Sequence, residues 1–457
     1  EAAPLGGGSG VFRKIGTALE YNEVNNMDKL MVRRGNPLHG EVSISGSKNA
    51  ALPIMIASLL CEDVVTLENV PDIADTKNIT RIMKTLDVDV EYLDEHTLRI
   101  DSRHMTNRCA DCEEVRKMRA SYYYLGALLG RFGSARVAFP GGCNFGVRPI
   151  DLHIKGFEAL GAVVSTQSII EMKADNLMGA RIFLDFASVG ATINIMLAAV
   201  KARGTTVIEN AAKEPHVVDT ASFLNSMGAD VKGAGTDTIR IRGVRKMHGS
   251  SYAIIPDQIE AGTYMVAAAI SEGEVTIRNL IPRHMESISA KLREAGVRIA
   301  QGGDWITVSG RDCRLRPTKV KTMPYPGFPT DMQPQMMALL SIIQGTSMVN
   351  ESVFDDRFRY VEELKKMGAH IDVEGHIAIV EGVDRLVGTE VQATDLRAGA
   401  AMILAGLAAE GTTYITNVEY IDRGYESMVE HFRDLGADIS RVSDDGPDLK
   451  LIKSVAV

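Results

Sequence analysis

The segment FPGGCNFGVRPIDLH, residues 139–153, places a single thiol, Cys143, five residues before Arg148. Glycines at positions 141, 142 and 146 predict a flexible loop rather than a packed strand. A neighbouring arginine lowers the pKa of a thiol and favours the reactive thiolate. Cys143 is therefore a candidate nucleophile or proton donor, and the alternative is a buried thiol that packs as a small apolar side chain. Asp331, in the glycine- and proline-rich segment PGFPTDMQPQ, is a candidate general base.

Basic side chains recur in other predicted loops. Arginine holds carboxylate and phosphate groups with a planar fork of donors, and lysine supplies a point charge, so a cleft lined by them suits a small polyanionic ligand. Any one of them taken alone is more often a solvated surface charge. The segment SGSKNAALP adds a helix start whose backbone N–H groups would face an anion. The charged and polar candidates are Lys48, Asn49, Arg119, Arg148, Asp151, Asp331, Arg357, Arg397 and Arg423.

The composition excludes several classes of protein. The 457 residues are 45% hydrophobic and 24% charged, which is typical of a soluble globular protein of two or three domains. A net charge of −9 gives no basic footprint for a nucleic acid, and no apolar run is long enough to span a membrane. Five cysteines are too few for a disulfide framework, which predicts a reducing, cytoplasmic location. Cys109 and Cys112 lack the second ligand pair of a zinc site, so we expect no metal.

The elements that must position these residues follow a repeat of about 70 residues. Five asparagines each follow a short β-branched run, at spacings of 141, 69, 71 and 67 residues, and a further copy near residue 140 would fill the double spacing. Five glycines each follow an amphipathic stretch, as expected for the left-handed residue that ends a helix. The sequence therefore predicts six units. The asparagines are Asn69, Asn210, Asn279, Asn350 and Asn417, and the glycines are Gly161, Gly228, Gly296, Gly368 and Gly436.

Each unit is predicted to run strand–helix–strand–helix–strand–strand. In the last unit, apolar side chains from Tyr425 to Leu435 fall on one face of a helix. Alternating residues predict hairpin strands at 237–243, 304–310 and 375–382, and residues 188–204 and 395–411 read as tightly packed helices. Three units per domain, with a boundary near residue 255, is the natural division. Residues 1–26, which begin EAAPLGGGSG, are predicted to be a flexible leader or a cloning remnant outside the fold.

Six segments then carry a family resemblance that runs from about Met27 to the C-terminus. SGSKNAALP, VRKMRAS, FPGGCNFGVRPIDLHIKG, SVGAT, PGFPTDMQPQ and YIDRGYE, in this order, resemble the UDP-N-acetylglucosamine 1-carboxyvinyltransferases of the enolpyruvyl transferase family. The resemblance implies an α/β fold of two inside-out α/β barrel domains, each built from three repeats with pseudo-threefold symmetry. It places the first domain at 48–255 and the second at 27–47 plus 256–457, because the N-terminal strand of the family pairs with the second domain.

The resemblance also implies a reaction, which needs no cofactor. The enolpyruvyl group of phosphoenolpyruvate would pass to the 3-hydroxyl of UDP-N-acetylglucosamine through a tetrahedral ketal, with release of phosphate. Cys143 would protonate the methylene carbon of phosphoenolpyruvate, Asp331 would take the proton of the sugar hydroxyl, and Lys48 and Arg423 would complete the catalytic set. The implied substrate-binding residues are Lys48, Asn49, Arg119, Arg148, Pro149, Ile150, Asp151, Leu152, Ser188, Val189, Gly190, Asp331, Val353, Arg357 and Arg397.

Two departures and two alternatives accompany the resemblance. Ile193 and His216 stand where relatives often carry carboxylates, and both are expected on the nucleotide side. The shikimate-pathway enolpyruvyl transferase is the first alternative, but it lacks the cysteine loop. A regulatory paralogue that binds UDP-N-acetylglucosamine without turnover is the second, and the retained catalytic residues argue against it. The sequence leaves the oligomeric state open, and a monomer is compatible with it.

Overall fold

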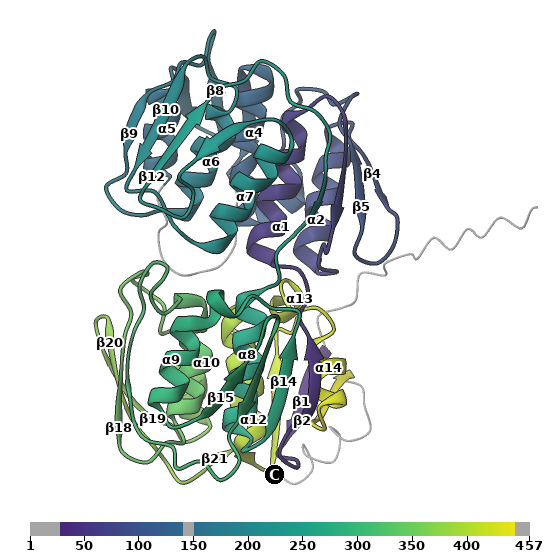
Figure 1. Cartoon of the computed structure of the whole chain (residues 1–457). Helices are drawn as coiled ribbons and strands as arrows, with labels where there is room; N and C mark the ends of the chain where they lie inside the picture. The colour runs from purple at the N-terminus through teal and green to yellow at the C-terminus, as the bar shows by residue number, and fades with distance from the viewer. Residues whose placement is uncertain (1–27, 140–149, 444–457) are drawn as a thin grey trace, which may run out of the picture.

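A computed structural model of the chain describes residues 28–139 and 150–443. They form two lobes, one stacked on the other (Figure 1). The core of the upper lobe gathers buried side chains between Ala50 and Ile254. The core of the lower lobe gathers those between Leu30 and Ile44 together with those between Ile259 and Ile439. The chain therefore starts in the lower lobe, builds the upper lobe and then returns.

The same order of elements recurs along the chain: an inner helix, a central strand, an outer helix and then one or two antiparallel strands. In the upper lobe the inner helices are α1 (Lys48–Ala57), α4 (Tyr123–Phe132) and α6 (Val189–Ala199), and the central strands are β3 (Val64–Glu68), β6 (Ser134–Ala138) and β10 (Thr205–Glu209). The outer helices are α2 (Ala74–Thr85), α5 (Asp151–Ala159) and α7 (Pro215–Ser226). The hairpins are β4 (Asp89–Tyr92) with β5 (Leu98–Asp101), β7 (Val163–Thr166) with β8 (Ile169–Lys173), and β11 (Asp230–Lys232) with β12 (Thr238–Arg242).

The lower lobe repeats this order. Its inner helices are α8 (Gln258–Ile270), α10 (Gln333–Leu340) and α12 (Leu396–Ala408), and its central strands are β14 (Glu274–Arg278), β18 (Thr346–Asn350) and β24 (Thr412–Thr416). Its outer helices are α9 (Glu286–Glu294), α11 (Val361–Lys366) and α14 (Met428–Asp434). Its antiparallel strands are β15 (Arg298–Gln301) with β16 (Trp305–Ser309), β19 (His370–Glu374) with β20 (Ile377–Glu381), and β25 (Asp438–Ser443). The helices predicted at 188–204 and 395–411 and the strands predicted in the three hairpins are confirmed.

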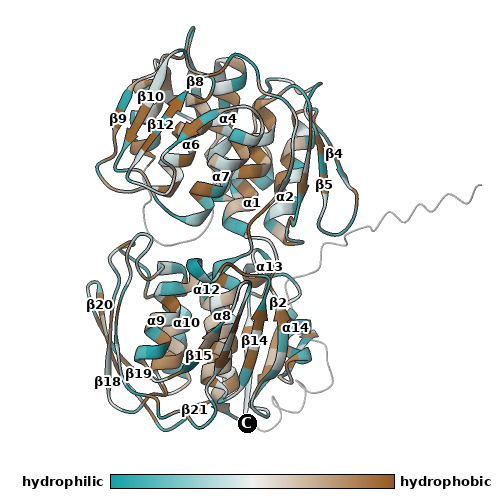
Figure 2. Cartoon of the chain, viewed as in Figure 1, coloured by the Kyte–Doolittle hydropathy of each residue, from teal (hydrophilic) through white to brown (hydrophobic). Residues whose placement is uncertain are grey.

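The inner helices are buried on almost every side. All residues from Ile259 to Ile270 of α8 and from Gln333 to Leu340 of α10 are buried. A helix that is apolar all round belongs in a core, and hydrophobic residues indeed run through the helices and strands of both lobes (Figure 2). Even so, none of the described helices combines the length and the apolar character that crossing a membrane requires.

Two strands are exchanged where the chain passes between the lobes. Strand β2 (His39–Ser43) precedes α1 but pairs in parallel with β14 of the lower lobe. Strand β13 (Ser251–Ala253) precedes α8 but pairs in parallel with β3 of the upper lobe. Strand β1 (Asp28–Arg33) lies between β24 and β25 and completes the last sheet. The N-terminal strands, purple in Figure 1, therefore lie in the lower lobe among green and yellow elements.

Left-handed residues mark the repeat. Asn69, φ 57°, follows β3, and its side-chain amide donates to the carbonyl of Ile254 at 2.8 Å, which ties the central strand to its parallel neighbour. Asn tolerates this conformation better than most residues. Asn210, Asn279 and Asn417 do the same, with φ of 56°, 54° and 59° and amide bonds to Leu184, Ile44 and Ala393. Asn350 differs, because it is the last residue of strand β18.

The helix ends follow the predicted pattern with one substitution. The five predicted glycines all have positive φ, between 89° for Gly368 and 99° for Gly296. In the first unit Asp87 takes the equivalent place, with φ 59°. Its carboxylate accepts a hydrogen bond from the hydroxyl of Thr106 at 2.7 Å, which gives the strained conformation a local partner.

The last helix starts later than expected. The apolar pattern predicts a single helix face from Tyr425 to Leu435, but α14 begins only at Met428. Ser427 has φ 44°, so the chain turns before the helix begins. Tyr425 is still buried, but in the preceding loop, where its hydroxyl contacts Thr263 at 3.0 Å.

Candidate active site

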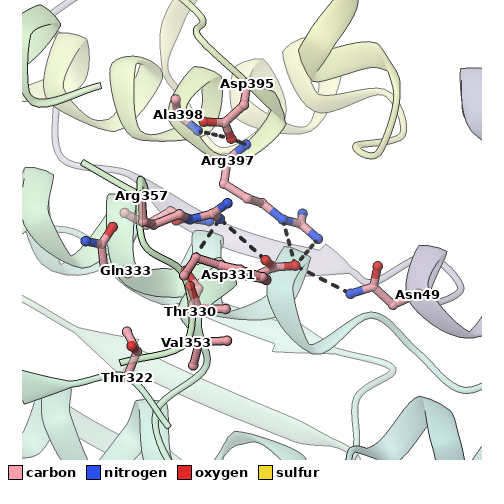
Figure 3. Close-up of polar contacts among 12 residues, drawn as sticks. Asn49, Thr322, Thr330, Asp331, Gln333, Val353, Arg357, Asp395, Arg397 and Ala398 are labelled. Carbon is pink, nitrogen blue, oxygen red and sulfur yellow. Dashed lines mark hydrogen bonds and ion pairs between the residues drawn. The ribbon is translucent and has the colours of Figure 1, made fainter. Parts of the chain in front are cut away.

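A carboxylate at the start of α10 gathers predicted residues from both lobes. Asp331 lies in the short helix η4 (Thr330–Met332), between two arginines of the lower lobe (Figure 3). Arg397 approaches Asp331 Oδ2 with Nη2 at 3.1 Å and Nε at 3.3 Å, and Nη2 of Arg357 lies 3.4 Å from Oδ1. The side-chain amide of Asn49, from the upper lobe, reaches Oδ2 at 3.5 Å. Three other predicted residues therefore meet at the Asp331 carboxylate.

The cluster strongly favours the ionised form of Asp331. Withdrawal from water raises the pKa of this carboxyl, but Arg397 and then Arg357 outweigh that effect and hold the pKa well below its usual range. Arg397 is only 3% exposed, and its Nη1 is buried with no hydrogen-bond partner among residues 28–139 and 150–443. Asp331 keeps 29% of its side-chain surface exposed. The cluster thus combines a reachable carboxylate with a buried donor that lacks an acceptor.

A second carboxylate, Glu351, supports the first. It is 1% exposed and accepts hydrogen bonds from the hydroxyls of Thr322 at 2.8 Å and Thr330 at 3.0 Å. It also accepts the backbone N–H groups of Val353 at 2.8 Å and Phe354 at 3.2 Å. Glu351 therefore ties the residue before the Asp331 carboxylate to the turn that carries the predicted substrate contact Val353.

Another carboxylate, Asp75, lies between basic residues of the two lobes. Lys48 Nζ is 2.8 Å from Asp75 Oδ2, and Nε of Arg423 is 3.0 Å from Oδ1. Lys48 is the first residue of α1, and Arg423 follows the short helix α13 (Glu419–Asp422) of the lower lobe. Burial raises the pKa of Asp75, but the two cations hold it below its ordinary value. The Asp75 side chain is only 2% exposed, so this carboxylate is closed to solvent, whereas Arg423 keeps 17% of its side-chain surface exposed.

The starts of several inner helices meet here. The carboxylate of Asp257 caps α8, accepting N–H groups of Ile259 and Glu260, and it also accepts the N–H of Lys48 at 3.0 Å. Asp395 caps α12 and accepts the N–H of Arg397 at 2.8 Å. The helix start predicted in SGSKNAALP is confirmed, and the anion that faces its first N–H is the carboxylate of Asp257. Helix N-termini carry partial positive charge, so their convergence favours anions.

A third group of predicted residues lies in the upper lobe. Arg119 stacks over the ring of Tyr122 at 5.6 Å, and His153 Nδ1 lies 2.9 Å from the side-chain amide of Asn194. Burial and then Arg119 lower the pKa of His153 to about 4, so the imidazole is neutral. The ring packs against Gly190, where a Cβ would come within 3.1 Å. The first turn of α6, which carries the predicted residues Ser188, Val189 and Gly190, is thereby placed beside His153.

Other predicted site residues lie at the start of α5 and in the turn after β18. Ile150 is the N-cap of α5, Asp151 and Leu152 begin that helix, and Val353 is 38% exposed. Cys143, Arg148 and Pro149 lie outside the described residues, as does the leader 1–26.

The two family departures fall in different environments. Ile193 is fully buried in the core of the upper lobe, so packing accounts for an apolar residue there. His216 lines a small cavity with Asn49, Asp257 and His284, close to the Asp331 cluster. Burial lowers the pKa of His216, against the opposing effect of nearby carboxylates, so it stays neutral.

Sequence reasoning missed Asp75 and Glu351. An acidic residue in the first turn of a helix is common on any protein surface, so Asp75 gave no separate signal. Glu351 did leave one. The residue after the repeat asparagine is apolar at Val70, Ala211 and Val418, whereas the fifth copy carries an acid.

The described residues were also compared with the requirements of a metal site and of a disulfide. Residues 28–139 and 150–443 contain no group of three or more His, Cys, Asp or Glu side chains that could hold a metal ion. Cys109 and Cys112 are free thiols, and burial raises the pKa of both. These two side chains therefore form no disulfide.

Comparisons with known proteins agree on one family. The model of the EPSP synthase (3-phosphoshikimate 1-carboxyvinyltransferase) family matches residues 32–432. A protein of Clostridium acetobutylicum named UDP-N-acetylglucosamine 1-carboxyvinyltransferase 2 is 57% identical over 417 residues, which cover 91% of this chain and 99% of the relative.

Solved structures extend the comparison to the fold. The enolpyruvyl transferase NikO from Streptomyces tendae superposes with a TM-score of 0.83 at 27% identity, over 92% of this chain and all of that one. EPSP synthase from Acinetobacter baumannii gives a TM-score of 0.71 at 20% identity, over 91% of this chain and all of that one. At that identity the second likeness shows a common fold alone.

Proposed function

The chain belongs to the UDP-N-acetylglucosamine 1-carboxyvinyltransferases, within the enolpyruvyl transferases, and we propose that it performs their reaction with residues drawn from both lobes. It is a transferase of peptidoglycan synthesis. The reaction moves enolpyruvyl from phosphoenolpyruvate to the 3-hydroxyl of UDP-N-acetylglucosamine and releases phosphate. The observation that carries the proposal is the pair of carboxylates, Asp75 and Asp331, each held between two basic side chains at converging helix starts.

The proposed architecture is two inside-out α/β barrel domains with three repeats each. Two separate cores, inner helices buried on nearly all sides and the sixfold recurrence of one element order support it. The proposed domains are 48–255 and 27–47 plus 256–457. The exchange of β2 and β13 at the two connections supports this division, since each strand pairs in the lobe that the chain is leaving.

The basic residues fit an intermediate that concentrates negative charge. Addition of the sugar hydroxyl to phosphoenolpyruvate gives a tetrahedral ketal that carries a carboxylate and a phosphate on one carbon. Preorganised cations stabilise such charge most in a site withdrawn from water. Lys48, Arg423, Arg357 and Arg397 are proposed to supply them, and each already contacts a carboxylate in the protein. The unpaired Nη1 of Arg397 supports a binding role, because a buried donor without an acceptor is costly unless a ligand supplies one.

Asp331 is proposed to take the proton of the sugar hydroxyl. In the free protein its pKa is far too low for an efficient base, because the two arginines stabilise its charge. An anionic substrate that binds Arg397 and Arg357 would share their positive charge and raise the pKa of Asp331. The carboxylate would then gain basicity when both substrates are present. Its 29% exposure supports the role, since the hydroxyl must reach it.

The remaining roles follow from the family membership. Cys143 is proposed to protonate the methylene carbon of phosphoenolpyruvate. The UDP-sugar is proposed to contact Arg119, Arg148, Pro149, the start of α5 (Ile150 to Leu152), the start of α6 (Ser188 to Gly190), and Asn49 and Val353.

The decisive experiment measures phosphate release from phosphoenolpyruvate with UDP-N-acetylglucosamine, with shikimate 3-phosphate and with no acceptor. We expect release only with UDP-N-acetylglucosamine. Release only with shikimate 3-phosphate would keep the fold and overturn the acceptor. Absence of release with either would favour a regulatory paralogue.

The cysteine assignment has a test of its own. Fosfomycin is an epoxide that alkylates a thiolate, so Cys143→Ala should abolish covalent labelling, as followed by intact-protein mass. Cys313→Ala is the matched control, because Cys313 is a partly buried thiol of the lower lobe. Undiminished labelling of Cys143→Ala would overturn the assignment.

A further inference from the structure

Glu426 of the lower lobe is held by two groups of the upper lobe. Its Oε1 lies 2.6 Å from Nε2 of His96, and its Oε2 accepts the backbone N–H of Asp72 at 2.9 Å. The Glu426 side chain is only 13% exposed, although His96 remains 42% exposed. The turn that carries His96 is itself fixed, because the carbonyl of His96 accepts the N–H of Val70 at 2.9 Å.

These contacts lie beside the Asp75 cluster. Glu426 follows Arg423 by three residues, and Asp72 precedes Asp75 by three residues. Arg423 contacts Asp75 at 3.0 Å, so the two short segments touch at both ends. Because the segment from Arg423 to Glu426 is held at both ends, Arg423 is ordered before a ligand binds. Binding then costs less conformational freedom.

We propose that His96 and Glu426 form a positioning pair that fixes Arg423 between the lobes for the anion of phosphoenolpyruvate. The inference rests on the proposed function, because it assigns Arg423 to that substrate. Neither His96 nor Glu426 contacts the reacting groups in this role. Their effect reaches the substrate through the loop 423–426.

The charge of the pair depends on the titration of His96. Its hydrogen bond with Glu426 raises the pKa of His96 above the ordinary 6.5, against the opposing effect of burial. The imidazolium form, and with it the charged pair, is therefore present below the ordinary pKa and is lost as the pH rises through the raised value. Other charged groups face the pair from each neighbouring element: Asp94 and Glu95 of the same turn, Asp72 with its partner Lys77, Arg423, and the buried Glu260 of α8.

The kinetic test separates positioning from a general loss of structure. In His96→Gln at pH 6.5, we expect KM for phosphoenolpyruvate to rise about fivefold, as for loss of a partly exposed ion pair. We expect kcat and KM for UDP-N-acetylglucosamine to stay within about twofold. The ratio of KM between variant and wild type should fall towards one as the pH rises through the raised pKa of His96, because the imidazole is then neutral and no longer pairs as a cation with Glu426. Taking the ratio cancels the titration of the substrate.

Four further variants extend the test. His96→Arg keeps the positive charge at every pH and should hold KM for phosphoenolpyruvate low across the range. Glu426→Gln should raise KM about as much as His96→Gln, and the double variant should add little, because both remove one interaction. His376→Gln is the matched control: His376 is an exposed histidine of the lower lobe that lies 3.9 Å from Asp355, and its replacement should leave KM unchanged.

A titration independent of turnover tests the pair itself. The imidazole resonances of His96 should report a raised pKa in the wild type and an ordinary one in Glu426→Gln. Equal pKa values in the two proteins would overturn the proposal. So would a KM ratio of one at pH 6.5, or equal changes for both substrates, in an enzyme that turns over normally. A wild type that releases no phosphate would instead overturn the proposed function.

Discussion

Asp75 and Asp331 are both carboxylates that lie between two cations, but they differ in exposure and in the length of their contacts. Asp75 is 2% exposed and meets Lys48 and Arg423 at 2.8 and 3.0 Å, with one cation from each lobe. Asp331 is 29% exposed and meets Arg397 and Arg357 at 3.1 and 3.4 Å, both from the lower lobe.

The difference indicates a division of labour. Close, dry contacts give Asp75 little freedom to do anything except neutralise and orient its two cations. Longer contacts and partial exposure leave Asp331 within reach of a hydroxyl group, and the donors beside it can be shared with a bound anion. In the proposed function the cations of both clusters meet anionic groups of the substrates, but only the Asp331 carboxylate is exposed enough to take a proton from a hydroxyl group.

The largest effect is expected from Asp331→Asn. Loss of a general base typically lowers turnover by about 10²- to 10⁴-fold, and we expect kcat to fall by about 10³-fold while UDP-N-acetylglucosamine still binds. Steady-state kinetics and calorimetric binding would check this. Asp75→Asn is the matched change at the closed cluster and should weaken phosphoenolpyruvate binding more than it lowers kcat. A near-normal kcat in Asp331→Asn would contradict the base role.

For stability, the larger effect is expected from the change at Asp75 and the smaller one from the change at Asp331. Removing one partner of a buried ion pair costs about 3–5 kcal/mol, because the remaining charge stays buried. Asp75→Asn leaves two cations without compensation, and we expect a loss of about 3 kcal/mol in the free energy of unfolding. Asp331→Asn should cost about half as much, since water reaches the Asp331 carboxylate and its contacts with the two arginines are longer. Urea unfolding of both variants gives the comparison, and a larger loss for Asp331→Asn would refute the distinction between closed and open clusters.

Much of the fold could be predicted because its repeats depend on local conformations with residue preferences. Left-handed positions favour Asn and Gly, so their spacing revealed the units before any contact was known. Helices buried on all sides are mostly apolar along their length, which made α6 and α12 easy to find. The partners of β1, β2 and β13 could not be derived from their own residues, because alternation indicates a strand but not its neighbour.

The candidate site likewise contains residues that the sequence could predict and residues that it could not. Its cations stand in motifs, so Lys48, Arg397 and Arg423 could be found from the sequence. Asp75 could not, because its role depends on a contact with a residue 348 positions away. Glu351 was within reach of the sequence, since it breaks the apolar pattern of the repeat in the unit that carries Asp331.

Glu351 provides a further test of the Asp331 cluster, because it anchors the residue next to Asp331. Glu351→Gln keeps the shape but replaces one acceptor oxygen with a donor that faces other donors. We expect a loss of about 1–2 kcal/mol in the free energy of unfolding. We also expect kcat/KM for UDP-N-acetylglucosamine to fall about tenfold, because Thr330 and Val353 lose their common anchor. Glu363→Gln is the control, since Glu363 is a mostly buried acceptor on an outer helix. An equal loss of activity in both variants would show that the Glu351 effect is not specific.

The smallest effect is a dependence on pH. The folded-state pKa of Asp75 lies below its usual value, so its stabilising contribution is complete above the unfolded pKa of about 3.9 and is lost as the pH falls through the folded value. The stability gap between wild type and Asp75→Asn should therefore be constant above about pH 5. Between pH 5 and pH 3.5 it should shrink by about 0.7 kcal/mol, provided that Asp75 stays ionised in the folded protein. Urea unfolding at several pH values measures this gap, in which titrations shared by both proteins cancel. A gap that widens on acidification would mean that burial, not the two cations, dominates the pKa of Asp75.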